Sequence, residues 1–265
     1  VGGSGLKVSP VAFGFEGLAD CSSSAVFEML DVYHEQVQGF FYCFNENVKI
    51  MAPIFAEWIE DRKIKRENIV ISAVILSDLS YGPNAAGLSR SNIRSRISEL
   101  TALFRTEYID IIQMEYYDQG TDLKETLGSL NDLVRAGTVR YISAGHFAGW
   151  QVQKVVDYAD FNGWEKPVAI HAKYSLFERH IELELFSVCR NEGLGLIAIL
   201  ASDTRNESVT KVITDVANKR QISKMAVQMA WVMQQIGITS VLINPTNVSE
   251  LKELNVGCKV QLSSD

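Results

Sequence analysis

Three side chains suited to acid-base chemistry or metal binding are expected at the carboxyl ends of successive β-rich runs. These residues are Glu115, His146 and His171. One carboxylate and two imidazoles are the ligand set of many non-haem iron sites, so a metal site is one hypothesis. Their spacing follows the strand ends and matches no metal motif. We therefore favour a hydrogen-bonded pocket that holds no metal.

Tyr42 and Cys43 could supply an acid or a nucleophile. Neither has a lysine, arginine or histidine beside it to lower its pKa, so we interpret both as packing side chains. Asp118 and Asp122 precede a segment of helical period, which is typical of helix caps and solvated loop acids. The segment Glu60–Glu67 mixes charges of both signs and is interpreted as a solvated helix end and loop.

These residues must be positioned by alternating strands and helices. Apolar residues recur every three or four positions between the β-rich runs, as in Leu123–Val134. The predicted strands lie near Val11–Phe15, Gly39–Phe44, Asn68–Ile75, Tyr108–Glu115, Thr138–Ala144, Val168–Tyr174, Leu194–Leu200 and Thr239–Ile243. This α/β pattern favours a closed (β/α)8 TIM barrel over an open doubly wound sheet, with residues 1–265 in a single domain.

Composition argues against several classes of partner. The chain has 265 residues and a formal net charge of -7, so nothing predicts binding of nucleic acid or of an anionic membrane. No apolar run reaches the roughly 18 residues of a membrane span, so we expect a soluble protein without direct membrane insertion. Cys21, Cys43, Cys189 and Cys258 lack paired spacing. Reduced thiols fit the cytoplasm or the matrix of a mitochondrion or plastid, and Val1 in first place fits a removed transit peptide.

Five segments carry a resemblance to one enzyme superfamily. They are residues 108–118, 4–10, 125–137, 174–179 and 226–231. In this order they resemble the aldo-keto reductases, which are NADP-dependent oxidoreductase barrels, and the likeness spans nearly the whole chain. The resemblance implies one aldo-keto reductase-like barrel.

The resemblance also implies where catalytic residues should stand. The superfamily uses a tyrosine acid tuned by a lysine that pairs with an aspartate, with a histidine that orients the carbonyl. Here the aspartate position is Tyr42, the tyrosine position is Asn47, the lysine position is Val74 and the histidine position is Glu115. The resemblance therefore predicts a degenerate member without the catalytic tetrad.

The positions that hold the cofactor in the superfamily are altered as well. They read Gly145 and His146 for a serine and asparagine pair, His171 for a glutamine, Ile199 for a stacking aromatic, and Thr246 for a basic residue. A short segment, 201–207, replaces the long loop that usually folds over the cofactor. We expect the NADP site to be lost and no cofactor to be bound.

A retained scaffold without chemistry favours a catalytically inactive protein. The resemblance extends to potassium-channel β subunits, which are accessory members of the superfamily. We therefore expect a structural or accessory subunit that forms a hetero-oligomer with other proteins. The alternatives are an NADP(H)-dependent oxidoreductase of altered mechanism, and a barrel that binds a metal or a small ligand through Glu115, His146 and His171.

Overall fold

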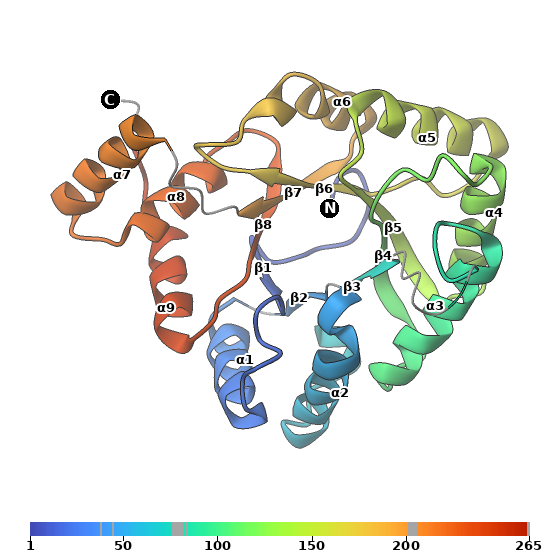
Figure 1. Cartoon of the computed structure of the whole chain (residues 1–265), viewed down its shortest axis with the longest axis horizontal. Coiled ribbons are helices and arrows are strands. Elements are labelled where there is room, and N and C mark those ends of the chain that lie inside the picture. The colour runs from blue at the N-terminus through green and yellow to red at the C-terminus, as the bar shows by residue number, and fades with distance from the viewer. Residues whose placement is uncertain (38, 44, 76–81, 83, 201–205, 264–265) are drawn as a thin grey trace.

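The computed structural model describes residues 1–37, 39–43, 45–75, 82, 84–200 and 206–263, and its strands form a closed barrel (Figure 1). The strands are β1 (Val11–Gly14), β2 (Phe40–Cys43), β3 (Val70–Ile75), β4 (Ile109–Met114), β5 (Val139–Gly145), β6 (Ala169–Tyr174), β7 (Gly195–Leu200) and β8 (Ile238–Ile243). Each strand pairs in parallel with the next, and β8 pairs with β1. The predicted (β/α)8 barrel is confirmed, and the open sheet is wrong.

Helices surround the barrel and follow the strands in the chain. They are α1 (Ser23–Val37), α2 (Asn45–Asp61), α3 (Arg90–Leu103), α4 (Leu123–Arg135), α5 (Gly149–Asn162), α6 (Leu185–Glu192), α7 (Glu207–Arg220), α8 (Lys224–Met233) and α9 (Val248–Gly257), with short 3-10 turns η1 (Arg66–Asn68) and η3 (His180–Glu182). Asp122 caps α4, because its Oδ1 accepts a hydrogen bond from the N–H of Lys124 at 2.8 Å. This confirms the prediction that Asp122 is a helix cap.

The alternation of side chains along the strands produces two apolar layers. The inner layer fills the barrel and contains Ala12, Phe40, Tyr42, Val74, Ile111, Ala169, Ile197, Ile199 and Leu242. The outer layer packs the strands against the helices, as Phe41 does against Phe55 and Trp58 of α2. Both faces of every strand are therefore covered, which explains the continuous apolar runs in the sequence.

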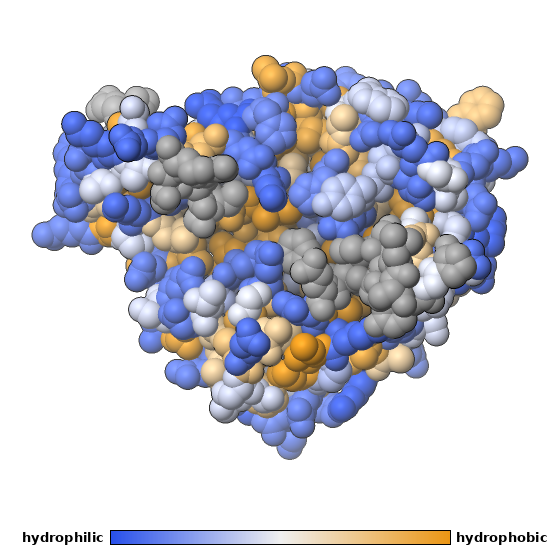
Figure 2. Space-filling model, in the orientation of Figure 1, coloured by the Kyte–Doolittle hydropathy of each residue, from blue (hydrophilic) through white to orange (hydrophobic). Residues whose placement is uncertain are grey.

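The N-terminal segment closes the amino end of the barrel. Val1, Leu6 and Val8 pack against the inner layer, and the N–H of Gly3 donates to the carbonyl of Gly193. In Figure 1 this segment is faded and lies behind the strands, so the viewer faces the carboxyl end. In the same orientation, Figure 2 shows apolar surface in the middle of this face, with hydrophilic residues around it.

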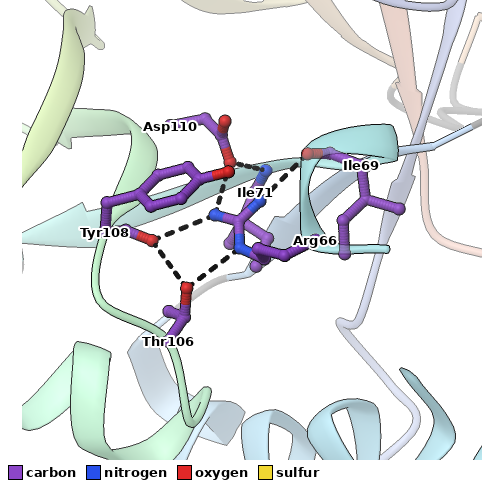
Figure 3. A network of polar contacts seen from close by, with 6 residues as sticks. All are labelled: Arg66, Ile69, Ile71, Thr106, Tyr108 and Asp110. Atoms are coloured by element: carbon purple, nitrogen blue, oxygen red, sulfur yellow. Dashed lines mark hydrogen bonds and ion pairs between the residues drawn. The ribbon is translucent and has the colours of Figure 1, made fainter. Parts of the chain in front are cut away.

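An arginine network joins β3, β4 and η1 (Figure 3). The guanidinium of Arg66 donates to the Oγ1 of Thr106, the carbonyls of Ile69 and Tyr108, and the Oδ2 of Asp110. Its side chain is only 19% exposed, and that of Asp110 is 12% exposed. The interpretation of segment 60–67 as solvated is therefore wrong for Arg66, because its guanidinium is partly buried in an ion pair with the carboxylate of Asp110, 44 positions further along the chain.

The sequence also predicts reduced thiols and the absence of a membrane-spanning segment. Cys43 and Cys189 are buried, Cys21 and Cys258 are partly exposed, and all four are free cysteines. Among the described helices, none combines the length and the apolar character needed to cross a bilayer.

Candidate functional site

The four positions that match the superfamily's catalytic residues come from the second, third and fourth β/α units. Tyr42 and Val74 belong to the inner layer of the barrel. Glu115 directly follows β4 and is partly buried, and Asn47 lies in the first turn of α2. No lysine accompanies them, because the side chain at position 74 is an apolar isopropyl group that is 1% exposed. The matched positions thus lack the ammonium group that tunes a tyrosine acid.

The Tyr42 hydroxyl is engaged inside the barrel. It donates to the Oε1 of Gln113 at 2.8 Å, and the ring stacks on His171 with centroids 5.0 Å apart. Burial raises the pKa of Tyr42 well above its usual value, and the charge of Glu115 adds to the rise. A phenol with a raised pKa is a weaker proton donor at neutral pH than a free tyrosine.

Glycines at two strand ends let longer side chains lie across the barrel. A β-carbon at position 145 would overlap the Nε2 of Gln113, and one at position 14 would overlap the Oδ1 of Asn244. Gln113 is fully buried, and Asn244 is tied to Glu16 by a hydrogen bond of 3.0 Å. The space over Gly14 and Gly145 is therefore occupied by this chain's own amides.

The two histidines have different environments although they are linked by the backbone. The N–H of His146 donates to the carbonyl of His171, but the left-handed backbone of His146 (φ 53°) turns its ring onto Tyr116, with centroids 5.2 Å apart. Burial lowers the pKa of His171 to about 3, and the charge of His146 acts in the same direction. Burial lowers the pKa of His146 as well, and the charge of Lys173 lowers it further. Both rings are mainly neutral at pH 7.

The structure does not bring Glu115, His146 and His171 into one ligand set. Glu115 lines a cavity of about 390 Å³, and His146 lines a different one of about 500 Å³. His171 is fully buried against Tyr42 and lines neither. Within the part of the chain that the structure describes, no three His, Cys, Asp or Glu side chains are grouped to hold a metal ion.

The positions matched to cofactor contacts do not fit a dinucleotide phosphate. The N–H and Oγ1 of Thr246 both donate to the Oε2 of Glu250 at 2.8 Å, and the N–H of Glu250 donates to Asn247. A carboxylate and a capping amide therefore already occupy the start of α9, where a phosphate would need free donors and positive charge. Ile199 belongs to the inner apolar layer and offers no aromatic face. Most of segment 201–207 lies outside the described residues.

Three contributors to the site were not identified from the sequence. Gln113 is the partner of Tyr42, Asn244 covers Gly14, and Lys173 lies on the cavity beside His146. The polar residue inside the apolar run of β4 was a usable signal for Gln113, because alternation places it on the inner face two positions before Glu115. Asp118, predicted as a cap or a solvated acid, accepts hydrogen bonds from the N–H groups of Leu88 and Gly120 and so orders a loop.

Comparisons with known proteins agree with this fold. A profile of the aldo/keto reductase family matches residues 49–203. The uncharacterized oxidoreductase YrpG of Bacillus subtilis is 25% identical over all of this chain and 92% of that protein. Norsolorinic acid reductase B of Aspergillus parasiticus is 22% identical over 98% of this chain and 79% of that protein. An aldo-keto reductase of Fusarium vanettenii is 29% identical over 69% of this chain and 57% of that protein. Because the family profile spans more than half of a chain that folds as a closed parallel barrel, this protein belongs to the aldo/keto reductase family.

Proposed function

We propose that this family member does not act as a reductase and that its barrel serves as an accessory subunit in a hetero-oligomer with other proteins. The observation that carries the proposal is the buried isopropyl group of Val74 at the position matched to the superfamily's lysine. General acid catalysis contributes about 10² to 10⁴ in rate, and it depends on a donor whose pKa is tuned. Tyr42, held by Gln113 and raised in pKa, does not provide such a donor.

The cofactor positions support the same proposal. Glu250 occupies the start of α9, and its negative charge opposes a bound phosphate. Reduction by NADPH needs both a held dinucleotide and a proton donor. Each requirement is disfavoured by a different part of the chain, so the loss of chemistry does not depend on one substitution.

A run of aromatic side chains beside the carboxyl end supports a role in binding other proteins. Tyr117 contacts Phe147 and Trp150, with ring centroids 5.6 and 5.7 Å apart. Tyr116 and Trp150 are 59% and 57% exposed. Exposed aromatic residues are enriched in protein interfaces, so this surface is our candidate for contact with a partner.

Three measurements test the proposal, the first two on the purified full chain. Titration with NADPH, followed by protein fluorescence, should show no saturable binding, and aryl aldehydes with NADPH should show no turnover above the buffer rate. Native mass spectrometry on material isolated gently from its own source should give a heteromeric mass. Saturable NADPH binding together with turnover would overturn the loss of chemistry. A free monomer or homo-oligomer would overturn the subunit role.

An NADP(H)-dependent oxidoreductase of altered mechanism is the second candidate. It is favoured by the relatives, which carry the names oxidoreductase, aldo-keto reductase and norsolorinic acid reductase. In that case the donor must lie near the carboxyl end, where Tyr116 is the exposed phenol beside Glu115. A Tyr116→Phe variant would then abolish the turnover, whereas our proposal leaves no turnover to lose.

A further inference from the structure

A cavity of about 500 Å³ lies outside the barrel, in the groove between the starts of α5 and α6. Its apolar walls are Phe147, Ala172, Ile181, Leu183 and Leu185. Ala172 belongs to the outer layer, so this wall of the cavity lies on the helix side of β6, and His146 and Lys173 line the cavity at the carboxyl ends of β5 and β6. Cavities of this size with a few polar groups on apolar walls are the usual form of small-molecule sites.

The carboxylates that line the cavity form no ion pair with its lysine among the described residues. The Oε2 of Glu184 accepts a hydrogen bond from the N–H of Gly149 at 3.1 Å, at the positive end of α5. The carboxylate of Glu178 lies 3.6 Å from the Nδ1 of His180. Lys173 lines the same cavity, and among the described residues its ammonium has neither a hydrogen bond nor an ion pair within 4.0 Å.

The imidazole of His146, which also lines the cavity, does not add a positive charge that would attract an anion. Burial together with the charge of Lys173 lowers its pKa. The ring is therefore mainly neutral at pH 7, and Lys173 is left as a cation with no hydrogen bond or ion pair among the described residues. The single ammonium of Lys173 beside apolar walls is suited to a ligand that has one negative charge on an apolar body.

From this arrangement we infer that the groove between α5 and α6 binds a small apolar monocarboxylate, with its carboxylate on Lys173 and its body against Phe147, Ile181 and Leu185. A phosphate dianion fits less well, because Glu178 and Glu184 line the same cavity and would repel the second charge. The inference does not rest on the proposed loss of reductase chemistry, since none of the four positions matched to the catalytic tetrad lines the cavity.

Three probes that share one apolar body and differ in charge test this inference. Phenylacetate, 2-phenylethanol and 2-phenylethylamine are titrated into the full chain with labelled methyl groups and followed by NMR. Phenylacetate should bind most tightly and shift the methyls of Ala172, Ile181 and Leu185. Tighter binding of the amine, or shifts confined to Ile199 and Leu242 in the barrel interior, would overturn the inference.

Two lysine variants separate the charge of Lys173 from general surface effects. Lys173→Met keeps the aliphatic stem of an exposed residue and should weaken phenylacetate about tenfold, as expected for one charge-assisted contact. Lys154→Met is the matched control, because Lys154 packs over Tyr117 and does not line the cavity. Equal affinity in wild type and Lys173→Met, with both variants folded by circular dichroism, would refute the assignment of Lys173.

Discussion

Replacing Arg66 with methionine should destabilise the fold far more than the same replacement at a surface ion pair. Methionine retains an apolar stem but leaves the Asp110 carboxylate in this network with a hydrogen bond from the N–H of Ile71, at 2.9 Å (Figure 3). The Arg66 guanidinium also lies 4.2 Å from the centroid of the Tyr108 ring, and that contact is lost. Breaking one side of a buried ion pair costs about 3 to 5 kcal/mol.

The control is Arg90→Met, which breaks the exposed pair with Asp132. The nitrogen-oxygen distance there is 3.3 Å, and the two side chains are 49% and 48% exposed. Exposed pairs contribute about 0 to 1 kcal/mol. Urea unfolding of both variants at pH 7 measures the two costs, and a double-mutant cycle of Arg66→Met with Asp110→Asn should give a coupling of about 1 to 3 kcal/mol.

The cost of Arg66→Met should also depend on pH. Burial raises the pKa of Asp110, and the charge of Arg66 is the largest influence that opposes the rise. Without Arg66 this pKa rises further, so the folded variant binds a proton at a pH where the unfolded chain does not. Stability from such a raised carboxyl is full below its unfolded pKa and is lost as pH rises through its folded pKa. The variant should therefore be less impaired at pH 4 than at pH 7. A cost under about 1 kcal/mol at pH 7, equal to that of Arg90→Met, would refute the reasoning.

Gly145→Ala should cost about 1 to 3 kcal/mol in chemical unfolding, because the new β-carbon overlaps Gln113 and displaces it from Tyr42. Gly5→Ala, where no atom lies within 4 Å of the new carbon, is its control and should be near neutral; equal costs would contradict the packing argument. His171→Leu should flatten the pH dependence of stability, since a histidine whose pKa falls to about 3 in the folded state loses stability as pH drops below about 6.5. The slopes should differ by at most about 1.4 kcal/mol per pH unit between those values, and identical slopes from pH 7 to 4 would count against a buried, neutral His171.

The strands could be predicted from the sequence because each is buried on both faces. Apolar runs such as the one around Ile197 can be recognised as strands without knowing which strand each one pairs with. The (β/α)8 architecture follows from their number and from the helical segments between them. These features depend on short stretches of chain, which is why local patterns suffice.

Contacts between distant residues and the direction of side chains could not be predicted in this way. Position at strand ends indicated that Glu115, His146 and His171 lie near one end of the barrel. It did not indicate that a left-handed backbone turns the ring of His146 onto Tyr116. Arg66 appeared solvated because its charged neighbours are solvated, and its partner Asp110 stands in a different strand.

The buried environment of Val74 determines whether a lysine could be introduced at this position. A lysine introduced there alone would place an ammonium in the inner layer with Phe40 and Ile111, where an unpaired charge is costly. The superfamily meets that cost with an aspartate, and the matched position holds Tyr42, whose hydroxyl is committed to Gln113. The lysine therefore becomes tolerable only after Tyr42 changes, and Tyr42→Asp alone would bury a carboxylate without its lysine. Each single step is unfavourable by itself, so the lysine and the aspartate would have to be introduced together.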